Sequence, residues 1–279
     1  MSPTALEDHL SARRAAGRKL LVPYVTGGLG RDWLHLVEAV VAAGADGVEI
    51  GIPFSDPSID GPTIQEASAK ALAGGATPAS VLGALSQIQI GVPLVAMTYY
   101  NLIFRAGHQR FAADLAAAGF SGTIVPDLPP ERAGDWTASA DEAGVANVLL
   151  VAPVTSDERI RMIAEQTRGF VYGVSVMDTT GEREALSDTA AQVAKRVKAQ
   201  THRPVLIGFG VSSASHAQEI AQYADGVVVA SALMRRVLDG MDVDGAVELI
   251  VRMRAALDEL AGAATGQVQV PTRPTSPAR

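Results

Sequence analysis

The chain contains no cysteine, few lysines and few aromatic residues, and these absences exclude several classes of site. Without cysteine there is no disulfide, no thiolate zinc site and no cysteine nucleophile. Its 30 acidic residues outnumber its 23 basic ones, and the net charge of −7 argues against nucleic acid as a main partner. No apolar run reaches the roughly 18–20 residues that span a bilayer, so no membrane partner is expected.

Lysine and histidine are absent from the carboxyl ends of the expected strands, where the active site of an α/β enzyme is usually built. Lys19 precedes the first expected strand and the other three lysines fall on expected helices, which argues against a Schiff-base lysine. No histidine falls at the carboxyl end of an expected strand, and His108 alone is in or near a loop, which argues against a histidine metal site. No Gly-x-Ser-x-Gly elbow occurs either. We therefore expect no metal and no cofactor, and carboxylates remain for acid–base work.

Eight short apolar segments recur along the chain and predict eight strands buried on both faces, as in a parallel sheet. They are Leu20–Val25, Gly47–Gly51, Pro93–Tyr99, Gly122–Asp127, Asn147–Ala152, Phe170–Ser175, Val205–Gly210 and Gly226–Ser231. Helical segments lie between them: Asp32–Ala43, Thr63–Ala73, Gln109–Ala118, Ser156–Thr167, Asp188–Ala199 and Ser213–Tyr223.

This alternation predicts an α/β protein, a single (β/α)8 TIM barrel over residues 1–262. Thr4–Ala16 predicts an extra N-terminal helix that covers the bottom of the barrel, and residues 263–279 predict a disordered tail. A doubly wound open sheet is the structural alternative, but the turn after the first strand lacks the Gly-x-Gly-x-x-Gly spacing. The N-terminus shows acidic residues where a secretory signal would be apolar, so we expect a cytoplasmic protein.

The segment from Glu49 to Gln65 carries the strongest functional signal. Glu49 lies near the carboxyl end of the second strand, and Asp60 follows in a loop before Gly61-Pro62 opens a helix. Burying an unpaired carboxylate is costly, whereas a carboxylate where a parallel strand meets its loop can act as an acid or base in a cleft. Pairing of Glu49 with an arginine, and helix capping by Asp60, are the structural alternatives. Asp56, in a Ser-Asp-Pro turn, is more typical of a structural residue.

Other strand ends supply aromatic residues and small residues. Tyrosines and a phenylalanine could wall an aromatic ligand, although packing is their ordinary role: Tyr24, Tyr99, Tyr172 and Phe209. Asp127 could either line the site or hold loops together. The segments after the last three strands could bind a phosphate through backbone N–H groups and a helix N-terminus: Thr180-Gly181, Gly210 and Ala230-Ser231.

These blocks, in this order, resemble the tryptophan synthase α-subunit family over nearly the whole chain. The most specific pieces are residues 49–65, 97–105, 125–130, 169–172 and 208–210. The resemblance implies a (β/α)8 barrel that cleaves indole-3-glycerol phosphate to indole and glyceraldehyde 3-phosphate without metal or Schiff base. It also implies a tryptophan synthase β subunit as partner.

The resemblance also implies residue roles. Glu49 matches the general acid/base and Asp60 the acid that engages the indole N–H. Gly181, Gly210, Ala230 and Ser231 match the phosphate positions, and Thr180 and Asp127 match loop contacts. Tyr24, Tyr99, Tyr172 and Phe209 match positions around the indole.

Three places depart from the family pattern: the loop after the sixth strand, residue 230, and Ser58-Ile59 in the loop that carries Asp60, where the family commonly has Leu-Ala. Val176 stands where the family has Arg, and Asp178 where it has Gly, in the loop after the sixth strand; these changes bear on coupling to a β subunit. Ala230 stands where the family has Gly and would slightly crowd the phosphate. Three other hypotheses stay open: a stand-alone lyase that releases free indole, a non-catalytic paralogue that binds a partner or a phosphate, and another phosphate-binding barrel such as an isomerase.

Overall fold

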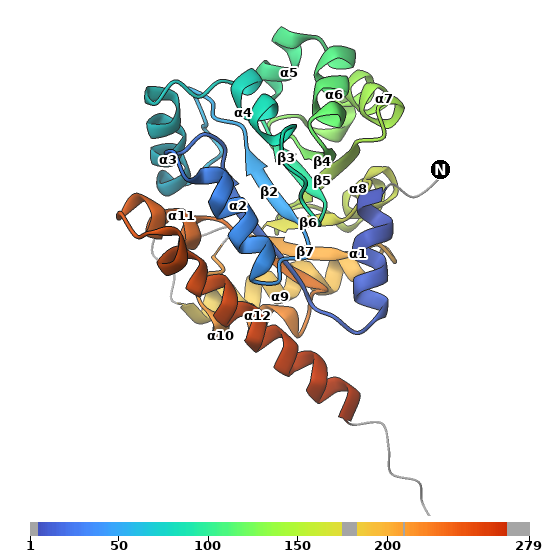
Figure 1. Ribbon diagram of the computed structural model, residues 1–279. Helices are drawn as coiled ribbons and strands as arrows, with labels where there is room; N and C mark the ends of the chain where they lie inside the picture. Colours follow the sequence, from blue (N-terminus) through green and yellow to red (C-terminus); the bar gives the residue numbers. More distant parts are fainter. Residues whose placement is uncertain (1–4, 175–182, 209, 267–279) are drawn as a thin grey trace, which may run out of the picture.

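The computed structural model describes residues 5–174, 183–208 and 210–266, and its strands close into a parallel barrel in the order β1 to β8 (Figure 1). The strands are β1 (Leu20–Thr26), β2 (Val48–Gly51), β3 (Leu94–Met97), β4 (Phe120–Ile124), β5 (Ala146–Val151), β6 (Val171–Val174), β7 (Val205–Gly208) and β8 (Gly226–Val229). Leu20 of β1 pairs with Gly226 of β8 and closes the cylinder. The (β/α)8 prediction is confirmed, and the open-sheet alternative is wrong.

Helices surround the barrel (Figure 1), and η1 (Pro130–Arg132) is a short 3-10 helix that follows β4 in the chain. They are α1 (Ala5–Ala15), α2 (Trp33–Ala42), α3 (Pro62–Ala73), α4 (Pro78–Leu85), α5 (Tyr100–Ala106), α6 (His108–Ala117), α7 (Gly134–Glu142), α8 (Asp157–Gln166), α9 (Arg183–Lys198), α10 (Ala214–Ala221), α11 (Ser231–Leu238) and α12 (Val243–Gly266). Helix α12 runs to Gly266, and the rest of the expected tail lies outside the described residues. Among the described helices, none is both long and apolar enough to cross a bilayer.

The apolar core has two layers. The larger one lies between the strands and the surrounding helices, and the smaller one fills the inside of the barrel. Leu6 and Leu10 of α1 belong to the inner layer, together with Leu20 and Phe170. Helix α1 therefore covers the amino ends of the strands, and the prediction of an N-terminal helix at the barrel bottom is confirmed.

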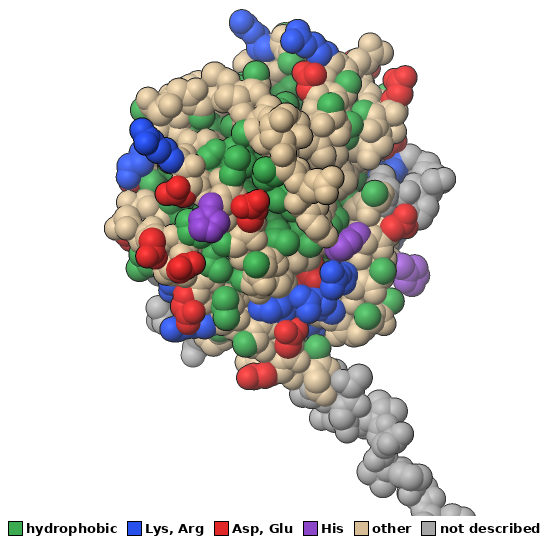
Figure 2. Space-filling model, in the orientation of Figure 1, with side chains coloured by type: hydrophobic (Ala, Val, Ile, Leu, Met, Phe, Trp, Pro, Cys, Tyr) green, Lys and Arg blue, Asp and Glu red, His purple; other side chains and the backbone are tan. Residues whose placement is uncertain are grey.

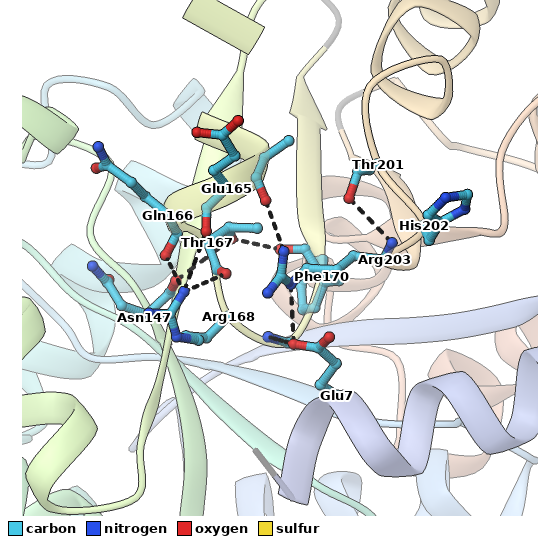
Figure 3. Close-up of polar contacts among 12 residues, drawn as sticks. Glu7, Asn147, Glu165, Gln166, Thr167, Arg168, Phe170, Thr201, His202 and Arg203 are labelled. Carbon is cyan, nitrogen blue, oxygen red and sulfur yellow. Dashed lines mark hydrogen bonds and ion pairs between the residues drawn. The ribbon is translucent and has the colours of Figure 1, made fainter. Parts of the chain in front are cut away.

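Polar contacts fix α1 to the strand starts (Figure 3). Glu7 accepts hydrogen bonds from the backbone N–H of Gly169 (3.3 Å) and from Nε of Arg203 (3.1 Å). Arg168, buried before β6, donates to the carbonyls of Gln166 (2.7 Å) and Thr167 (3.0 Å). These bonds connect α1 and the segment before β6 to the amino end of the barrel and satisfy backbone groups there.

The outer surface carries charge of both signs. In the orientation of Figure 1, acidic and basic side chains are interspersed over the face that shows α2 and α12 (Figure 2). Arg252 and Glu248, one turn apart on α12, form one such exposed pair at 2.7 Å. Exposed pairs of this kind contribute little to stability, so the fold depends mainly on the two core layers.

Candidate active site

Two adjoining cavities lie at the carboxyl ends of the strands. The larger, of about 730 Å³, extends over β3 to β6 and their loops; the smaller, of about 450 Å³, extends toward the loops after β7 and β8. Glu49, Asp60 and Tyr172 line both. The two predicted acids therefore converge on one mouth, at the end of the barrel where sites of this fold are built.

Glu49 is a buried carboxylate without a partner. It is 4% exposed, and its Oε2 atom has no hydrogen-bond partner. No described residue forms an ion pair with Glu49, so the structure does not support the alternative of an arginine partner. Burial, and to a lesser degree the nearby charge of Asp60, raises the pKa of Glu49 to about 8. The carboxyl group therefore holds its proton at neutral pH while it faces the cavities.

Asp60 has a different environment, although it lies on the same cavities. Burial raises the pKa of Asp60 to about 6, and the hydrogen bond from Tyr99 opposes that rise. The Tyr99 hydroxyl donates to Oδ2 of Asp60 (3.1 Å) and accepts from the backbone N–H of Ile59 (3.2 Å). At pH 7 Asp60 is mostly ionised and Glu49 mostly protonated, which gives one acid and one anion at the same mouth.

The four aromatic residues predicted to wall the site have different positions. Tyr172 lines both cavities and Tyr24 lines the smaller one. Tyr99 lines neither; it is buried beneath Asp60, with its ring stacked on Phe54 at a centroid distance of 5.1 Å. Phe209 lies outside the described residues.

Two glycines make room for the tyrosine rings. A Cβ atom on Gly51 would meet the Tyr24 hydroxyl, and a Cβ on Gly208 would meet the Tyr172 hydroxyl. Each ring lies against the backbone of the neighbouring strand, Tyr24 against β2 and Tyr172 against β7. Glycine is therefore required for close approach at the strand tops.

Several lining residues were missed in the sequence. Apolar side chains at strand ends face the larger cavity: Met97, Ile124, Leu150 and Val174, with Pro126 in the loop after β4. In the sequence they are indistinguishable from core residues, because parallel strands are apolar on both faces. An inward-facing position within the last two residues of a strand would have been the only sequence signal that these side chains line a cavity.

The predicted phosphate positions are described in part. Gly210, Ala230 and Ser231 line the smaller cavity together. Gly210 has φ of 81°, a conformation that favours glycine, and α10 and α11 both begin beside the cavity. Helix N-termini present free N–H groups and favour anions. The remaining predicted positions lie outside the described residues: Thr180, Gly181, Val176 and Asp178.

Asp127 and Asp56 hold loops. Oδ1 of Asp127 accepts from the backbone N–H of Tyr100 (2.9 Å) at the start of α5, while Asp127 also lines the larger cavity. Asp56 accepts from Ser55 in an exposed turn (2.6 Å) and lines neither cavity. Asp127 thus shows both of the roles that its sequence context left open.

The fold and these cavities define a (β/α)8 barrel in which two carboxyl side chains line the cavities at the carboxyl ends of the strands. A family model described as the tryptophan synthase alpha chain matches residues 10–264. The tryptophan synthase alpha chain of Thermobifida fusca is 42% identical over 260 residues, covering 91% of this chain and 96% of that one. The corresponding chain of Acidothermus cellulolyticus is 44% identical over 243 residues, covering 86% and 91%. The protein belongs to the tryptophan synthase alpha chain family.

Solved structures agree with the sequence relatives. A chain of Mycobacterium tuberculosis tryptophan synthase superposes with a TM-score of 0.84 at 39% identity, covering 92% of this chain and 99% of that one. The tryptophan synthase alpha subunit of Legionella pneumophila gives a TM-score of 0.84 at 32% identity, covering 92% and 100%. The similarity thus extends over the whole barrel.

Proposed function

We propose that this protein cleaves indole-3-glycerol phosphate to indole and glyceraldehyde 3-phosphate, as the α subunit of a tryptophan synthase. One observation carries the proposal: a protonated Glu49 and an ionised Asp60 line the same two cavities, and the smaller cavity leads to the backbone of Gly210 and Ser231. The family to which the chain belongs supports the same activity.

The reaction needs one proton delivered and one removed. Carbon C3 of the indole ring accepts a proton, and the bond from C3 to the side chain then breaks. The electron pair of that bond returns to the ring, while the adjacent hydroxyl loses its proton and becomes the aldehyde. Glu49, whose pKa is raised to about 8, can donate to C3 at neutral pH and can then accept the hydroxyl proton. The carboxyl group thus ends in the state in which it began.

Asp60 acts on the charge of the ring. Protonation at C3 places positive charge on the indole nitrogen, and an ionised carboxylate near the N–H stabilises that charge. The pKa of about 6 keeps Asp60 ionised at pH 7, and the Tyr99 hydroxyl fixes its orientation at 3.1 Å. The apolar side chains of the larger cavity suit the indole ring, and the smaller cavity suits the glycerol phosphate.

The β-subunit partner is supported by the family and by the surface at the mouth. Three large apolar side chains are exposed there, one each in the segments that follow β2, β3 and β5: Ile59 (45% exposed), Phe104 (66%) and Val154 (90%). The similar M. tuberculosis structure is described as tryptophan synthase. A β chain that covers this rim would remove exposed apolar area from water. A stand-alone lyase that leaves the rim uncovered is the second candidate.

Indole release by the purified chain, assayed with and without a tryptophan synthase β chain, tests both candidates. We expect turnover that rises strongly when the β chain is added; equal turnover in both assays would favour the stand-alone lyase. The Glu49→Gln variant should lose about 10²–10⁴-fold in kcat, the usual contribution of a general acid–base group, and still bind inorganic phosphate. Undiminished turnover by Glu49→Gln would contradict the proposal.

A further inference from the structure

The smaller cavity contains a positively chargeable side chain that the sequence left without a role. His216 lies in the first turn of α10 and lines the cavity beside Gly210 and Ser231. Its backbone N–H donates to the capping Ser213 hydroxyl (3.2 Å), so its position is fixed by the helix start. No histidine stands at an expected strand end, and His216 was missed because it lies beyond the end of β7. It reaches the cavity because the first turn of α10 lies beside it.

The charged side chains that line the smaller cavity give the position of His216 its importance. Among the described residues that line the smaller cavity, two are carboxylates, Glu49 and Asp60, and His216 is the one that can carry positive charge. In the larger cavity the corresponding cation is Arg159, which is already paired with Glu131 through two hydrogen bonds. At neutral pH Glu49 holds its proton and Asp60 is ionised, so a phosphate dianion that enters this cavity is repelled by the Asp60 carboxylate and gains from a side-chain donor beyond the neutral backbone amides.

One ring nitrogen of His216 has a partner among the described residues, and the other does not. Nδ1 of His216 lies 3.1 Å from the Ser212 hydroxyl, one turn earlier. This contact fixes the ring through Nδ1 and leaves Nε2 as the nitrogen for an incoming oxygen. The residue is half-buried, so water competes less for its ring than for a fully exposed side chain.

We infer that His216 is a phosphate-binding residue of this chain, which adds an imidazole N–H donor to the backbone cradle and selects for a phosphorylated ligand. This inference rests on the proposed function only in naming indole-3-glycerol phosphate as the ligand that carries the phosphate. Binding of a phosphate group to the smaller cavity can be measured separately, with inorganic phosphate.

Inorganic phosphate and free indole, titrated separately into the unliganded chain by calorimetry, test this inference. The His216→Gln variant should bind inorganic phosphate about tenfold more weakly, the contribution of one charge-assisted hydrogen bond, and bind indole unchanged. Its KM for indole-3-glycerol phosphate should rise by about the same factor, with kcat within about twofold. The control is His35→Gln on the exposed face of α2, for which all these values should stay the same.

The outcomes separate the two proposals. Unchanged phosphate affinity in His216→Gln, or an equal loss of phosphate and indole affinity, would overturn the role of His216. Failure of the wild-type chain to release indole would overturn the proposed function instead, while the phosphate titration would still decide the role of His216. If His216→Gln unfolds, His216→Asn provides the same comparison, and His216→Arg should restore phosphate affinity.

Discussion

Asp46 and Glu49 are buried carboxylates three residues apart in the sequence, yet their surroundings are opposite. Asp46, before β2 at the amino end of the barrel, accepts hydrogen bonds from Arg18 (2.6 Å), Arg254 (3.2 Å) and the backbone N–H of Leu21 (3.0 Å). Glu49, on β2 at the carboxyl end, has an Oε2 atom with no partner. The buried carboxylate at the amino end is therefore paired with arginines, whereas the one at the carboxyl end has no cationic partner among the described residues.

Asp225 shows that this difference belongs to the ends and not to single residues. It precedes β8 at the amino end and accepts from Lys198 (2.6 Å), Arg14 (3.4 Å) and the backbone N–H of Val205 (2.9 Å). Compensated carboxylates hold strand starts in place. Glu49, left without a partner at the carboxyl end, keeps a raised pKa, which acid–base work at neutral pH requires. The amino end of the barrel is therefore the stabilising end, and the carboxyl end carries the proposed active site.

The largest effect should come from breaking the compensation at the amino end. Asp46→Ala leaves the buried Arg254 and Arg18 without their shared partner, which should cost about 3–5 kcal/mol of stability. Urea denaturation, followed by circular dichroism, measures the free energy of unfolding of each variant. Asp258→Ala, which removes the exposed partner of the same Arg254 (2.7 Å), should cost less than about 1 kcal/mol. Equal losses in both variants would show that burial does not distinguish the pairs.

Glu49→Gln should have the opposite effect on stability, and the effect should depend on pH. The pKa of Glu49 is raised from 4.5 to about 8 in the folded chain, so between these values the folded state holds a proton that the unfolded state has lost. Wild-type stability should therefore fall as the pH rises through this window, and Glu49→Gln should remove that fall. We expect its gain in Tm over wild type to be small near pH 5 and larger near pH 8.

An exposed glutamate provides the control for that series. Glu38→Gln on α2 lies on the surface, and its Tm difference from wild type should stay constant over the same pH range. A constant difference for Glu49→Gln as well would mean that Glu49 is not held protonated by burial.

The smallest effect should come from adjusting Asp60 at the carboxyl end. Tyr99→Phe removes the hydroxyl that stabilises the ionised carboxylate, so the pKa of Asp60 should rise further above its ordinary value. The acid limb of the kcat/KM profile should move to higher pH, with about tenfold lower kcat/KM at pH 7. Tyr100→Phe is the matched control, since that hydroxyl contacts His108 (3.1 Å) and Tyr100 lines neither cavity. An unshifted profile in Tyr99→Phe would remove Tyr99 from the site.

Much of the fold could be predicted because parallel strands have a plain sequence signal. All eight apolar segments overlap observed strands, but Pro93–Tyr99 and Gly122–Asp127 were predicted past the ends of β3 and β4. Backbone at a strand top bends into its loop, and apolar composition does not mark that bend. Helices such as α4 and α5 were missed, since the first is short and the second begins inside a predicted strand–loop junction.

The candidate site was predicted in its acids and less well in its surroundings. Glu49 and Asp60 were recognisable because a carboxylate at the end of an apolar strand contradicts its context. The hydrogen bond from Tyr99 to Asp60 was not recognisable, because it joins residues about 40 positions apart. The cavity position of His216 was not recognisable either, because it depends on the direction in which α10 starts. Such contacts exist only after the barrel closes.

The sequence by itself determined the barrel, the two acids and the absence of cysteine chemistry, since apolar periodicity and residue type act locally along the chain. Tertiary structure alone decided which carboxylates would be compensated. Asp46 and Glu49 differ little in sequence context, but closing the cylinder brings arginines to one end and apolar walls to the other. Solvation and pairing, which set a pKa, are properties of that assembled surrounding.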